Sequence, residues 1–317
     1  MKIVVLDGYT TNPGDIDWSP LQSLGEVEIY DRTAPEEVVQ RAKEATVLLT
    51  NKVIINEDIL SHLPSLQYIG IMATGFNVVD LDAASRKNIV VTNVRGYSTH
   101  AVAQHTFALL FALKNRVETH SKLVHEGHWS LSKDFTFRAT PLLEVQGKTL
   151  GLLGLGDIGS RVAQIAQAFG MNVIAYRKNP QKTQNETIEM VDLDTLFEKS
   201  DVLSLHAPLS AETEQIVNSS RLEKMKSSAY LINTARGGLV NESDLAAALE
   251  SGKIAGAGLD VLSTEPPTAD NPLIGAKNCI ITPHIAWSLQ ETRQRLIHLL
   301  CENIRAFQAG QPINQVN

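Results

Sequence analysis

The stretch Leu150-Gly-Leu-Leu-Gly-Leu-Gly-Asp-Ile-Gly159 decides the fold of this chain. It reads as a buried strand that turns into a helix through Gly154, Gly156 and Gly159, the G-x-G-x-x-G pattern of a dinucleotide-binding βαβ unit. Backbone N–H groups at the start of such a helix bind a pyrophosphate. Residues 1–149 come before this stretch, so the sequence predicts that another domain folds first. A cleft between two domains is then the expected place for chemistry.

The pattern after the fingerprint continues as alternating helices and strands. Ile158, Val162 and Ile165 recur at helical spacing, and Gly170 is a typical helix stop. Asn241, with Asp244 three residues later, is typical of the N-cap of a further helix. A six-stranded doubly wound domain is predicted. Its strands after the fingerprint are expected at residues 172–176, 202–205, 230–233, 257–261 and 279–282.

The N-terminal part shows the same alternation on a smaller scale. Short apolar runs separated by helical stretches near residues 35–44 and 80–87 indicate a parallel sheet covered on both faces. A helix is predicted over residues 99–114, and a final one over 289–309 packs back on the first domain. The runs read as strands are residues 2–6, 27–30, 46–50, 66–72 and 89–94.

The expected fold class is therefore α/β with two domains. A doubly wound Rossmann nucleotide-binding domain, residues 99–287, is inserted into a flavodoxin-like substrate domain, residues 1–98 plus 288–317. The chain crosses between the domains twice, which predicts a hinge.

Composition narrows the class of protein. The net charge of −7 and the lack of a Lys/Arg-rich block argue against nucleic acid as a partner. No apolar run approaches the roughly 18 residues that span a bilayer, and no signal peptide is visible, so no membrane partner is expected. Cys279 and Cys301 form no C-x-x-C pattern, which fits a reducing compartment. A cytoplasmic protein is expected.

The second strand of the nucleotide domain ends in Arg177, followed by Lys178. An NAD site usually has Asp or Glu at this point, because a carboxylate accepts hydrogen bonds from the ribose hydroxyls. A guanidinium cannot accept those bonds, but it suits a 2′-phosphate. Arg177 therefore favours NADP(H) within a general NAD(P)H dependence. The alternative is a solvated arginine beside a site that accepts both nucleotides.

Three polar segments each follow a predicted strand, at the sheet edge where open α/β sheets bind ligands. Arg236 could clamp a carboxylate and polarise a neighbouring carbonyl. His284 could donate a proton as a hydride arrives, and a paired Glu265 would favour the protonated imidazolium. The segments are Asn233-Thr-Ala-Arg-Gly-Gly238, Leu259-Asp-Val-Leu-Ser-Thr-Glu-Pro-Pro267 and Thr282-Pro-His-Ile-Ala-Trp287.

With these residues in view, the chain resembles the D-isomer-specific 2-hydroxyacid dehydrogenase family over nearly its whole length. The ordered set Gly-Leu-Gly-Asp-Ile-Gly, Asn-Thr-Ala-Arg-Gly, Glu-Pro-Pro and Thr-Pro-His is specific in combination. The resemblance implies that Arg236, Glu265 and His284 are the catalytic residues. It also implies a homodimer formed through the nucleotide domain.

The same resemblance implies the binding residues. Backbone amides of the loop at residues 73–77 would meet the substrate carboxylate, and Asp260 matches the family residue that holds the nicotinamide amide. The implied substrate-binding residues are Thr74, Gly75, Arg236, His284 and Trp287. The implied cofactor-binding residues are Gly154, Leu155, Gly156, Asp157, Ile158, Gly159, Arg177, His206, Ala207, Pro208, Thr213, Thr234, Ala235 and Asp260.

Two details point to a subfamily. The opening Leu6-Asp-Gly-Tyr-Thr-Thr-Asn-Pro-Gly-Asp15 and Trp287 resemble bacterial glycerate dehydrogenases, also called hydroxypyruvate reductases. Glu265 stands where the family's formate dehydrogenases carry Gln, which favours a 2-oxo acid. The expected reaction is the NAD(P)H-dependent reduction of a small 2-oxo acid to the D-2-hydroxy acid. Hydroxypyruvate to D-glycerate is the favoured case, with glyoxylate also accepted.

Other functions stay open on the sequence. A D-lactate-type or phosphoglycerate substrate is possible within the family; a phosphorylated one needs cations near the 73–77 loop, and Arg95 is the nearest in sequence. A non-catalytic, NAD(H)-sensing corepressor-like protein is the alternative from another class, although the chain lacks the disordered tails of such proteins. Turnover of a 2-oxo acid would separate the two.

The remaining histidines carry less meaning. His120, His125 and His128 fit no single helical face, and no carboxylate or cysteine pattern completes a site, so no metal is expected. His100 and His105 fall on the helix predicted from residue 99, where packing is the expected role.

Overall fold

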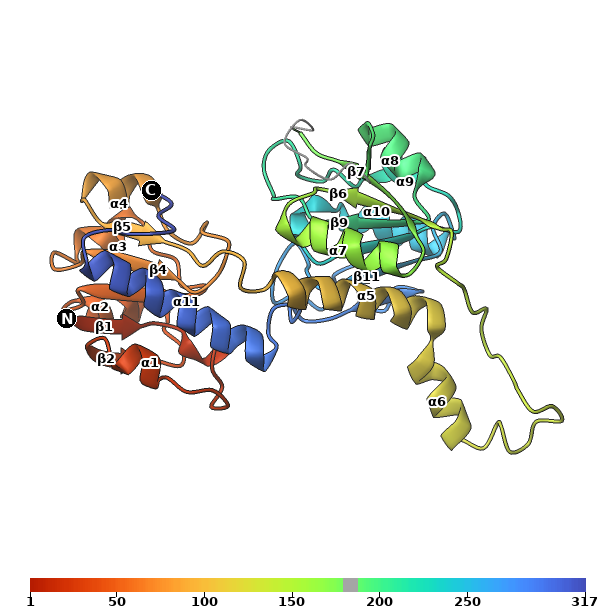
Figure 1. The fold of residues 1–317 in the computed structure, drawn as a ribbon, viewed down its shortest axis with the longest axis horizontal. Helices are drawn as coiled ribbons and strands as arrows, with labels where there is room; N and C mark the ends of the chain where they lie inside the picture. Colours follow the sequence, from red (N-terminus) through yellow and green to blue (C-terminus); the bar gives the residue numbers. More distant parts are fainter. Residues whose placement is uncertain (179–187) are drawn as a thin grey trace. The chain divides into compact units, whose positions relative to one another are not determined.

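The computed structural model of the chain describes residues 1–178 and 188–317 (Figure 1). These residues form two compact units. One contains Met1–Ser98 and Trp287–Asn317, and the other contains Thr99–Ala286. Trp287, which the sequence placed at the end of the second domain, thus belongs to the first unit.

The first unit is built on a five-stranded parallel sheet in the order β2-β1-β3-β4-β5, which is the predicted flavodoxin-like order. Its strands are β1 (Lys2–Val5), β2 (Glu26–Ile29), β3 (Val47–Thr50), β4 (Tyr68–Ile71) and β5 (Val90–Thr92). Its helices are η1 (Gly8–Thr10), α1 (Ser19–Gln22), η2 (Pro35–Glu37), α2 (Val38–Ala42), α3 (Glu57–Ser61), α4 (Leu81–Arg86) and α11 (Gln290–Gln308).

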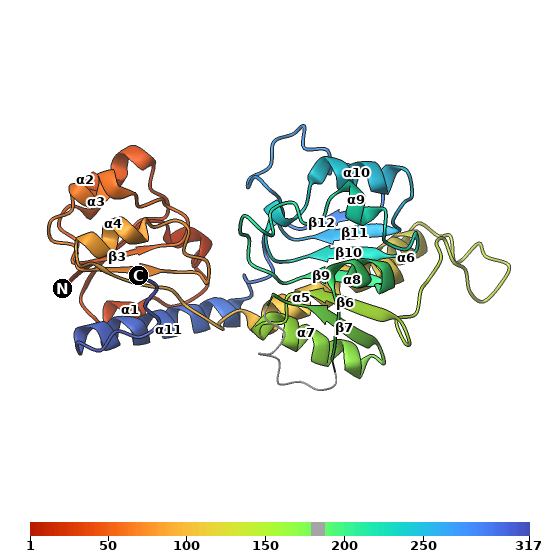
Figure 2. The same cartoon turned by 90° about the horizontal axis from the view of Figure 1, so that it is seen from above.

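Helices cover both faces of this sheet because successive strand side chains point to opposite sides. Ile3 and Val5 pack in one core with residues of α1 and α11. Val4 and Leu6 pack in the other core with residues of α2, α3 and α4. Figure 2 shows the two helical layers on either side of the strands. The strands β1, β3 and β4 are enclosed on both faces, which explains their continuous apolar runs, whereas the edge strand β2 alternates and is partly exposed.

The side chain of Arg293 ties α11 to the N-terminal loops. Its guanidinium donates to both carboxylate oxygens of Asp15, at 2.7 and 2.6 Å. The same side chain donates to the carbonyl oxygens of Thr11, at 3.1 Å, and Ser288, at 2.8 Å. The Arg293 guanidinium holds the pKa of the Asp15 carboxyl below its usual range. The last segment of the chain is thereby joined to residues near its start.

The second unit contains a seven-stranded parallel sheet in the order β12-β11-β10-β9-β6-β7-β8. This is the doubly wound Rossmann order with one further strand at the β12 edge, so the predicted fold class is confirmed. The prediction of six strands missed β8, a two-residue edge strand without an apolar run. The strands are β6 (Thr149–Leu153), β7 (Asn172–Tyr176), β8 (Glu189–Met190), β9 (Val202–Leu205), β10 (Tyr230–Asn233), β11 (Gly256–Leu259) and β12 (Cys279–Ile281).

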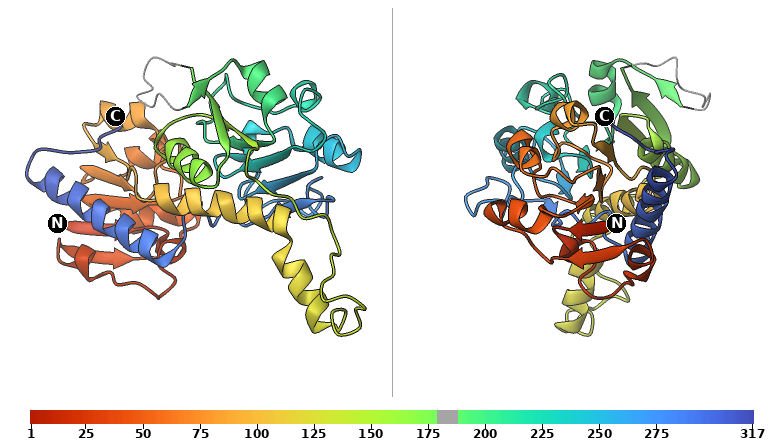
Figure 3. Two further views of the ribbon diagram at one scale, coloured as in Figure 1. Left: turned by 45° about the vertical axis from the view of Figure 1, so that its right-hand side comes forward. Right: turned by 90° about the vertical axis from the view of Figure 1, so that its left-hand side faces the viewer.

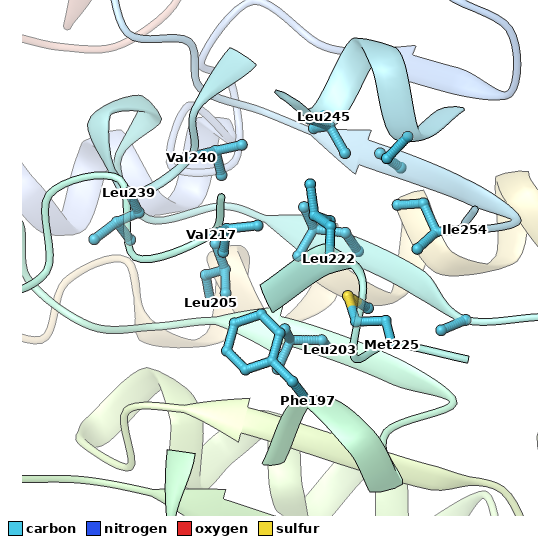
Figure 4. Packing of buried hydrophobic residues seen from close by; sticks show 14 of the residues in the cluster. Phe197, Leu203, Leu205, Val217, Leu222, Met225, Leu239, Val240, Leu245 and Ile254 are labelled. Carbon is cyan, nitrogen blue, oxygen red and sulfur yellow. The ribbon is translucent and has the colours of Figure 1, made fainter. Parts of the chain in front are cut away.

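Two groups of helices enclose this sheet. Residues of α5 and α7 pack against one face, and residues of α8, α9 and α10 pack against the other. Figure 4 shows part of the second core, where Phe197 and Leu203 lie beside Leu222 and Met225. The helices are α5 (Thr99–Asn115), α6 (Val117–His125), α7 (Asp157–Ala168), α8 (Leu193–Lys199), α9 (Ser219–Leu222), η4 (Gly237–Leu239) and α10 (Glu242–Glu250). The side chain of Asn241 accepts from the backbone N–H of Asp244 at 3.0 Å, which confirms the predicted N-cap.

The helix α6 and the segment after it extend away from the body of the second unit (Figure 3). No residue of α6 is buried. We call this extension, residues 117–143, the arm. Apolar side chains on the arm, such as Leu131 and Phe135, are exposed. Among the residues that the structure describes, no helix is both long and apolar enough to cross a membrane.

We expect Arg293→Lys to lower the melting temperature of the first unit by a few degrees at pH 7, because an ammonium cannot replace the two-pronged contact with Asp15. The pKa of Asp15 is lowered in the folded state, so this stabilisation is complete above the unfolded value near 3.8. It is lost as the pH falls through the folded pKa. Thermal unfolding followed by circular dichroism at pH 7 and in acid measures both effects.

Arg305→Lys is the matched control, because Arg305 lies exposed on the same helix. Equal melting temperatures for the two variants at pH 7 would contradict a stabilising role for Arg293.

Candidate active site

Glycines at the β6–α7 turn allow two loops of the second unit to touch. Gly154 has a φ of +99°, and a Cβ there would lie 2.7 Å from the carbonyl carbon of His206. A Cβ on Gly159 would lie 2.4 Å from the carbonyl oxygen of Gly154. A Cβ on Gly156, in contrast, would meet no protein atom within 4 Å. The space beside Gly156 at the start of α7 suits the close approach of a pyrophosphate.

The first turn of α7 begins with Asp157 and Ile158, directly after Leu155 and Gly156. The first N–H groups of a helix have no partner within the helix, so this turn offers donors to an anion. Arg177, which follows β7, donates from Nη1 to the carbonyl oxygen of Leu155 at 3.3 Å. The structure thus places the Arg177 guanidinium beside the glycine turn.

The loop after β9 forms the neighbouring wall. The backbone N–H of His206 donates to the carbonyl oxygen of Leu153 at 2.8 Å, and Nε2 of the His206 ring lies 2.9 Å from Ser204 Oγ. Burial lowers the pKa of His206 to about 4, so the ring is neutral at pH 7. Thr213 closes the Ala207–Pro208 loop, because its hydroxyl donates to the Pro208 carbonyl at 2.7 Å.

The turn after β10 is held by the side chain of Asn233. Its Oδ1 accepts from the N–H of Ala235 at 3.0 Å, and its Nδ2 donates to the carbonyl of Arg236 at 2.9 Å. The hydroxyl of Thr234 lies 3.1 Å from that of Thr106 on α5. The Arg236 side chain is exposed, so its guanidinium is accessible to an anionic ligand.

Gly237 brings the Arg236 turn against the loop after β11. A Cβ at this position would lie 1.9 Å from the carbonyl carbon of Leu262, so only glycine permits the approach. The N–H of Leu262 in turn donates to Glu265 Oε1 at 3.1 Å. One continuous set of contacts therefore joins the Arg236 turn to Glu265.

Glu265 and His284 form a close pair. The distance from His284 Nδ1 to Glu265 Oε2 is 2.6 Å, and the two side chains are 27% and 33% exposed. An ionised carboxylate only accepts, so the bond requires a proton on Nδ1. The structure brings together the two residues that the sequence predicted as partners.

Asp260 lies beneath the turn that carries His284. Its side chain is fully enclosed, with 0% exposure. Its carboxylate accepts from the N–H groups of Ile285 and Ala286, each at 2.9 Å, and from the Thr282 hydroxyl at 2.6 Å. His284 itself has a φ of +53°. Burial alone would raise the pKa of Asp260, but the hydrogen bonds together hold it below the usual range.

His105 also belongs to this network, although packing was the role favoured from the sequence. Its Nε2 lies 2.9 Å from the hydroxyl of Thr282 and 3.3 Å from Oδ1 of Asp260. The two contacts join His105 of α5 to Asp260 and Thr282, which lie 155 or more positions later in the chain. No local sequence pattern predicts such a contact.

In the first unit, the loop at residues 73–77 leaves the end of β4. The carbonyl of Ala73 accepts from the N–H of Val94 at 3.0 Å, and the carbonyl of Thr74 accepts from Asn93 Nδ2 at 2.6 Å. Thr74 is exposed and Gly75 half-buried. The loop's first carbonyls are thus occupied, while the loop itself lies at the carboxyl edge of the sheet.

A buried carboxylate sets the neighbouring loop after β3. Asp7 accepts from the N–H groups of Asn51, Lys52 and Val53 at 2.8, 2.6 and 3.2 Å. Burial raises the pKa of Asp7 even though these donors oppose the change. The exposed Lys52 therefore lies at the end of the strand next to β4, a position that sequence reasoning missed.

Trp287 also lies in the first unit, where its ring meets Tyr97 edge-on at a centroid distance of 6.4 Å. Of the residues expected at the substrate, Thr74, Gly75 and Trp287 thus belong to the first unit, and Arg236 and His284 to the second. Within residues 1–178 and 188–317, no group of three or more His, Cys, Asp or Glu side chains could hold a metal ion.

Comparison with known proteins identifies relatives along the entire chain. A hydroxypyruvate reductase of Blautia hydrogenotrophica is 48% identical over the full length of both chains. A glycerate dehydrogenase of Methylorubrum extorquens is 42% identical over 92% of each chain. The solved structure of an acyclic imino acid reductase in complex with NADPH and D-Arg superimposes with a TM-score of 0.88. That protein is 33% identical, with both chains covered completely.

The family model described as "D-isomer specific 2-hydroxyacid dehydrogenase, NAD binding domain" matches residues 107–286, more than half of the chain. The match contains the glycine turn, Arg236, Glu265 and His284. Together with the full-length relatives, it confirms the resemblance read from the motifs. The chain belongs to the D-isomer-specific 2-hydroxyacid dehydrogenase family and carries that family's nicotinamide-nucleotide-binding domain.

Proposed function

We propose that this protein reduces a small 2-oxo acid to the D-2-hydroxy acid, with hydroxypyruvate to D-glycerate as the favoured reaction and glyoxylate as a further substrate. The observation that carries the proposal is the 2.6 Å bond between His284 Nδ1 and Glu265 Oε2, on the sheet edge that also presents Arg236. The names of the two similar chains, a hydroxypyruvate reductase and a glycerate dehydrogenase, support the choice of substrate.

Arg236 binds the substrate in this proposal. When bound, the reduced nicotinamide supplies a hydride to the carbonyl carbon. The exposed guanidinium clamps the substrate carboxylate with two parallel hydrogen bonds and polarises the adjacent carbonyl oxygen. The bond from Asn233 to the Arg236 carbonyl fixes the turn from which the side chain extends.

His284 supplies the proton. Glu265 accepts from Nδ1, which leaves Nε2 as the nitrogen that gives its proton to the developing alkoxide. A carboxylate partner stabilises the imidazolium through a charge-assisted hydrogen bond. In the reverse oxidation, the neutral ring accepts the proton from the substrate hydroxyl.

The remaining substrate contacts come from the first unit. Backbone N–H groups at Thr74 and Gly75 bind the carboxylate, and Trp287 limits the size of the substrate. Lys52 and Arg95 lie after β3 and β5, the two strands that flank β4. Arg95 is the cation predicted near the 73–77 loop, and Lys52 is a second cation at this edge of the sheet. A phosphorylated acid therefore belongs among the substrates to assay.

The residues along the edge described above would hold the nucleotide. The turn at residues 154–159 would bind its pyrophosphate at the start of α7, and the loops at residues 206–213 and 234–235 would line the rest of the site. Asp260, enclosed by its donors, supports the nicotinamide end through the turn that it holds. The neutral ring of His206 adds no charge to this wall.

NADP(H) is the preferred nucleotide in this proposal. Arg177 follows β7 and donates to the Leu155 carbonyl beside the glycine turn, and a guanidinium at this point would suit a 2′-phosphate. The ammonium of Lys178 is instead bonded to the carboxylate of Glu212 at 2.6 Å.

A homodimer through the second unit completes the proposal. Exposed apolar side chains gather on α6 and the segment after it, which is unusual for a surface in water. An open pocket of about 660 Å³ near the base of this arm is lined by apolar residues that include Phe111 and Phe169, together with the polar residues Asn115, Glu144 and Gln146. The exposed side chains are Val117, Val124, Trp129, Leu131, Phe135, Leu142 and Leu143.

We expect turnover of hydroxypyruvate to be more efficient with NADPH than with NADH. Arg177→Ser should weaken NADPH binding roughly 10- to 100-fold, the worth of one charge-assisted hydrogen bond, and leave NADH binding nearly unchanged. Loss of nicotinamide absorbance and nucleotide titrations measure both effects. Lys178→Ser is the control from the adjacent position. An unaltered NADPH affinity in Arg177→Ser would remove the phosphate role, and no turnover of any 2-oxo acid would refute the enzyme assignment.

Arg236→Ala should lower kcat/KM for hydroxypyruvate by about 100- to 1,000-fold, with losses in both KM and kcat. Arg236→Lys keeps the charge but not the planar fork, so it should retain more activity. Steady-state kinetics of both variants test the role. Near-wild-type efficiency in Arg236→Ala would show that the clamp lies elsewhere.

The double substitution of Leu131→Ser and Phe135→Ser should shift the protein from dimer to monomer, because both side chains are at least 85% exposed on the arm. Light scattering after size-exclusion chromatography, over a dilution series, measures the mass. Ile54→Ser, also at an exposed apolar position but in the first unit, is the control. A monomeric wild-type protein would contradict the proposed assembly.

A further inference from the structure

The turn that presents His284 has a backbone conformation that needs support. A φ of +53° is uncommon for a residue with a side chain, and such positions persist only where surrounding groups hold them. The N–H of His284 donates to the Asp260 carbonyl at 2.8 Å, and the next two N–H groups donate to the Asp260 carboxylate. Asp260 therefore binds three consecutive N–H groups of the turn, one with its backbone carbonyl and two with its side-chain carboxylate.

The Asp260 carboxylate is held in turn by side chains from two elements. Thr282, just after β12, donates from its hydroxyl at 2.6 Å. His105, on α5, places Nε2 at 3.3 Å from Oδ1 of Asp260 and 2.9 Å from the Thr282 hydroxyl. The backbone N–H groups of Ile285 and Ala286 also donate to the carboxylate.

Counting protons determines the tautomer of His105. The hydroxyl of Thr282 has one proton, which it donates in the hydrogen bond to the carboxylate of Asp260. An ionised carboxylate has none to give. The remaining lone pairs on Thr282 and Asp260 can only accept, so Nε2 of His105 must carry a proton and donate it. His105 is a hydrogen-bond donor to this network and not a side chain that merely fills space.

We propose that His105 is a positioning residue for the proton transfer at His284: its Nε2–H, acting through Asp260 and Thr282, holds the left-handed turn that presents the imidazole to the substrate. This inference rests on the proposed role of His284 as the acid. His105 itself touches neither the substrate nor the reacting atoms in this proposal.

The chemistry of the position supports this role over packing. The His105 side chain is 19% exposed, and the Asp260 side chain is not exposed at all. An enclosed carboxylate is costly unless donors satisfy it. Burial by itself would raise the pKa of Asp260. The pKa is nevertheless below its usual range, because hydrogen bonds outweigh burial, and those from the side chains of His105 and Thr282 have the largest lowering effect. An apolar residue at position 105 would remove the donor that α5 contributes.

The test compares His105→Leu, which removes the donor, with His105→Gln, which keeps a neutral N–H donor. We expect kcat for hydroxypyruvate to fall by about 10- to 100-fold in His105→Leu, because a small displacement of a reacting group has effects of this size. KM should stay within about twofold of wild type, and any rise in the dissociation constant of the nucleotide should be smaller than the fall in kcat. His105→Gln should recover most of kcat. Gln104→Leu, an exposed neighbour on α5, is the matched control.

The pH profile gives a readout that a purely structural role would not move. Without its donor from α5, Asp260 becomes easier to protonate, so the acid limb of kcat should shift to higher pH in His105→Leu. The shift should be smaller in His105→Gln. If His105→Leu folds poorly, Thr282→Val removes the bridging hydroxyl at constant size, and Thr282→Ser restores it. Thr282→Val should then show the same loss of kcat, and Thr282→Ser should not.

Two outcomes would overturn the proposal. A folded His105→Leu with wild-type kcat and an unchanged acid limb, while His284→Asn is inactive, would refute the role of His105 and leave the proposed function intact. Full activity in His284→Asn would refute the proposed function and, with it, this inference. A loss confined to nucleotide affinity would also refute it, because the effect would then act on the cofactor instead of on His284.

Discussion

Three positions without side chains allow the second unit to form a continuous binding edge. The glycine turn after β6 lies directly against the backbone of His206, and the turn after β10 lies directly against the backbone of Leu262. Any Cβ at Gly154, Gly159 or Gly237 would overlap a neighbouring main chain. Because the strands are parallel, their loops leave the sheet at the same edge. The close approaches then join loops that are far apart in sequence, and the candidate site exists only because they do.

The elements that sequence reasoning found are those whose burial imposes a pattern. Strands such as β7, β9 and β10 are enclosed on both faces, so each reads as an apolar run with clear ends and was predicted to the residue. The strand β8 is too short for any pattern and carries Glu189. The single-turn helices α1 and α3 were also missed, because four or five residues that stand alone show no helical period, whereas α2 continues from η2 and was predicted.

The site divides in the same way. Arg236, Glu265 and His284 could be predicted because each follows a strand end, where a parallel sheet presents its ligand-binding groups. The contact of His105 with Asp260 depends instead on how α5 packs across the sheet, which no spacing along the chain encodes. The placement of Lys52 likewise depends on the buried carboxylate of Asp7, 45 residues earlier. Predictions from strand ends therefore identify reacting groups more readily than the groups that support them.

The support under His284 has to be polar, and it has to be a carboxylate. The turn must remain partly exposed to meet a substrate, so apolar packing cannot hold its left-handed backbone from above. Asp260 accepts from the Ile285 N–H with Oδ1 and from the Ala286 N–H with Oδ2. An asparagine of the same shape would turn an amide NH₂ toward one of these donors and leave it unsatisfied. The enclosed carboxylate of Asp260 thus allows a left-handed main chain to present the partly exposed imidazole of His284 as a proton donor.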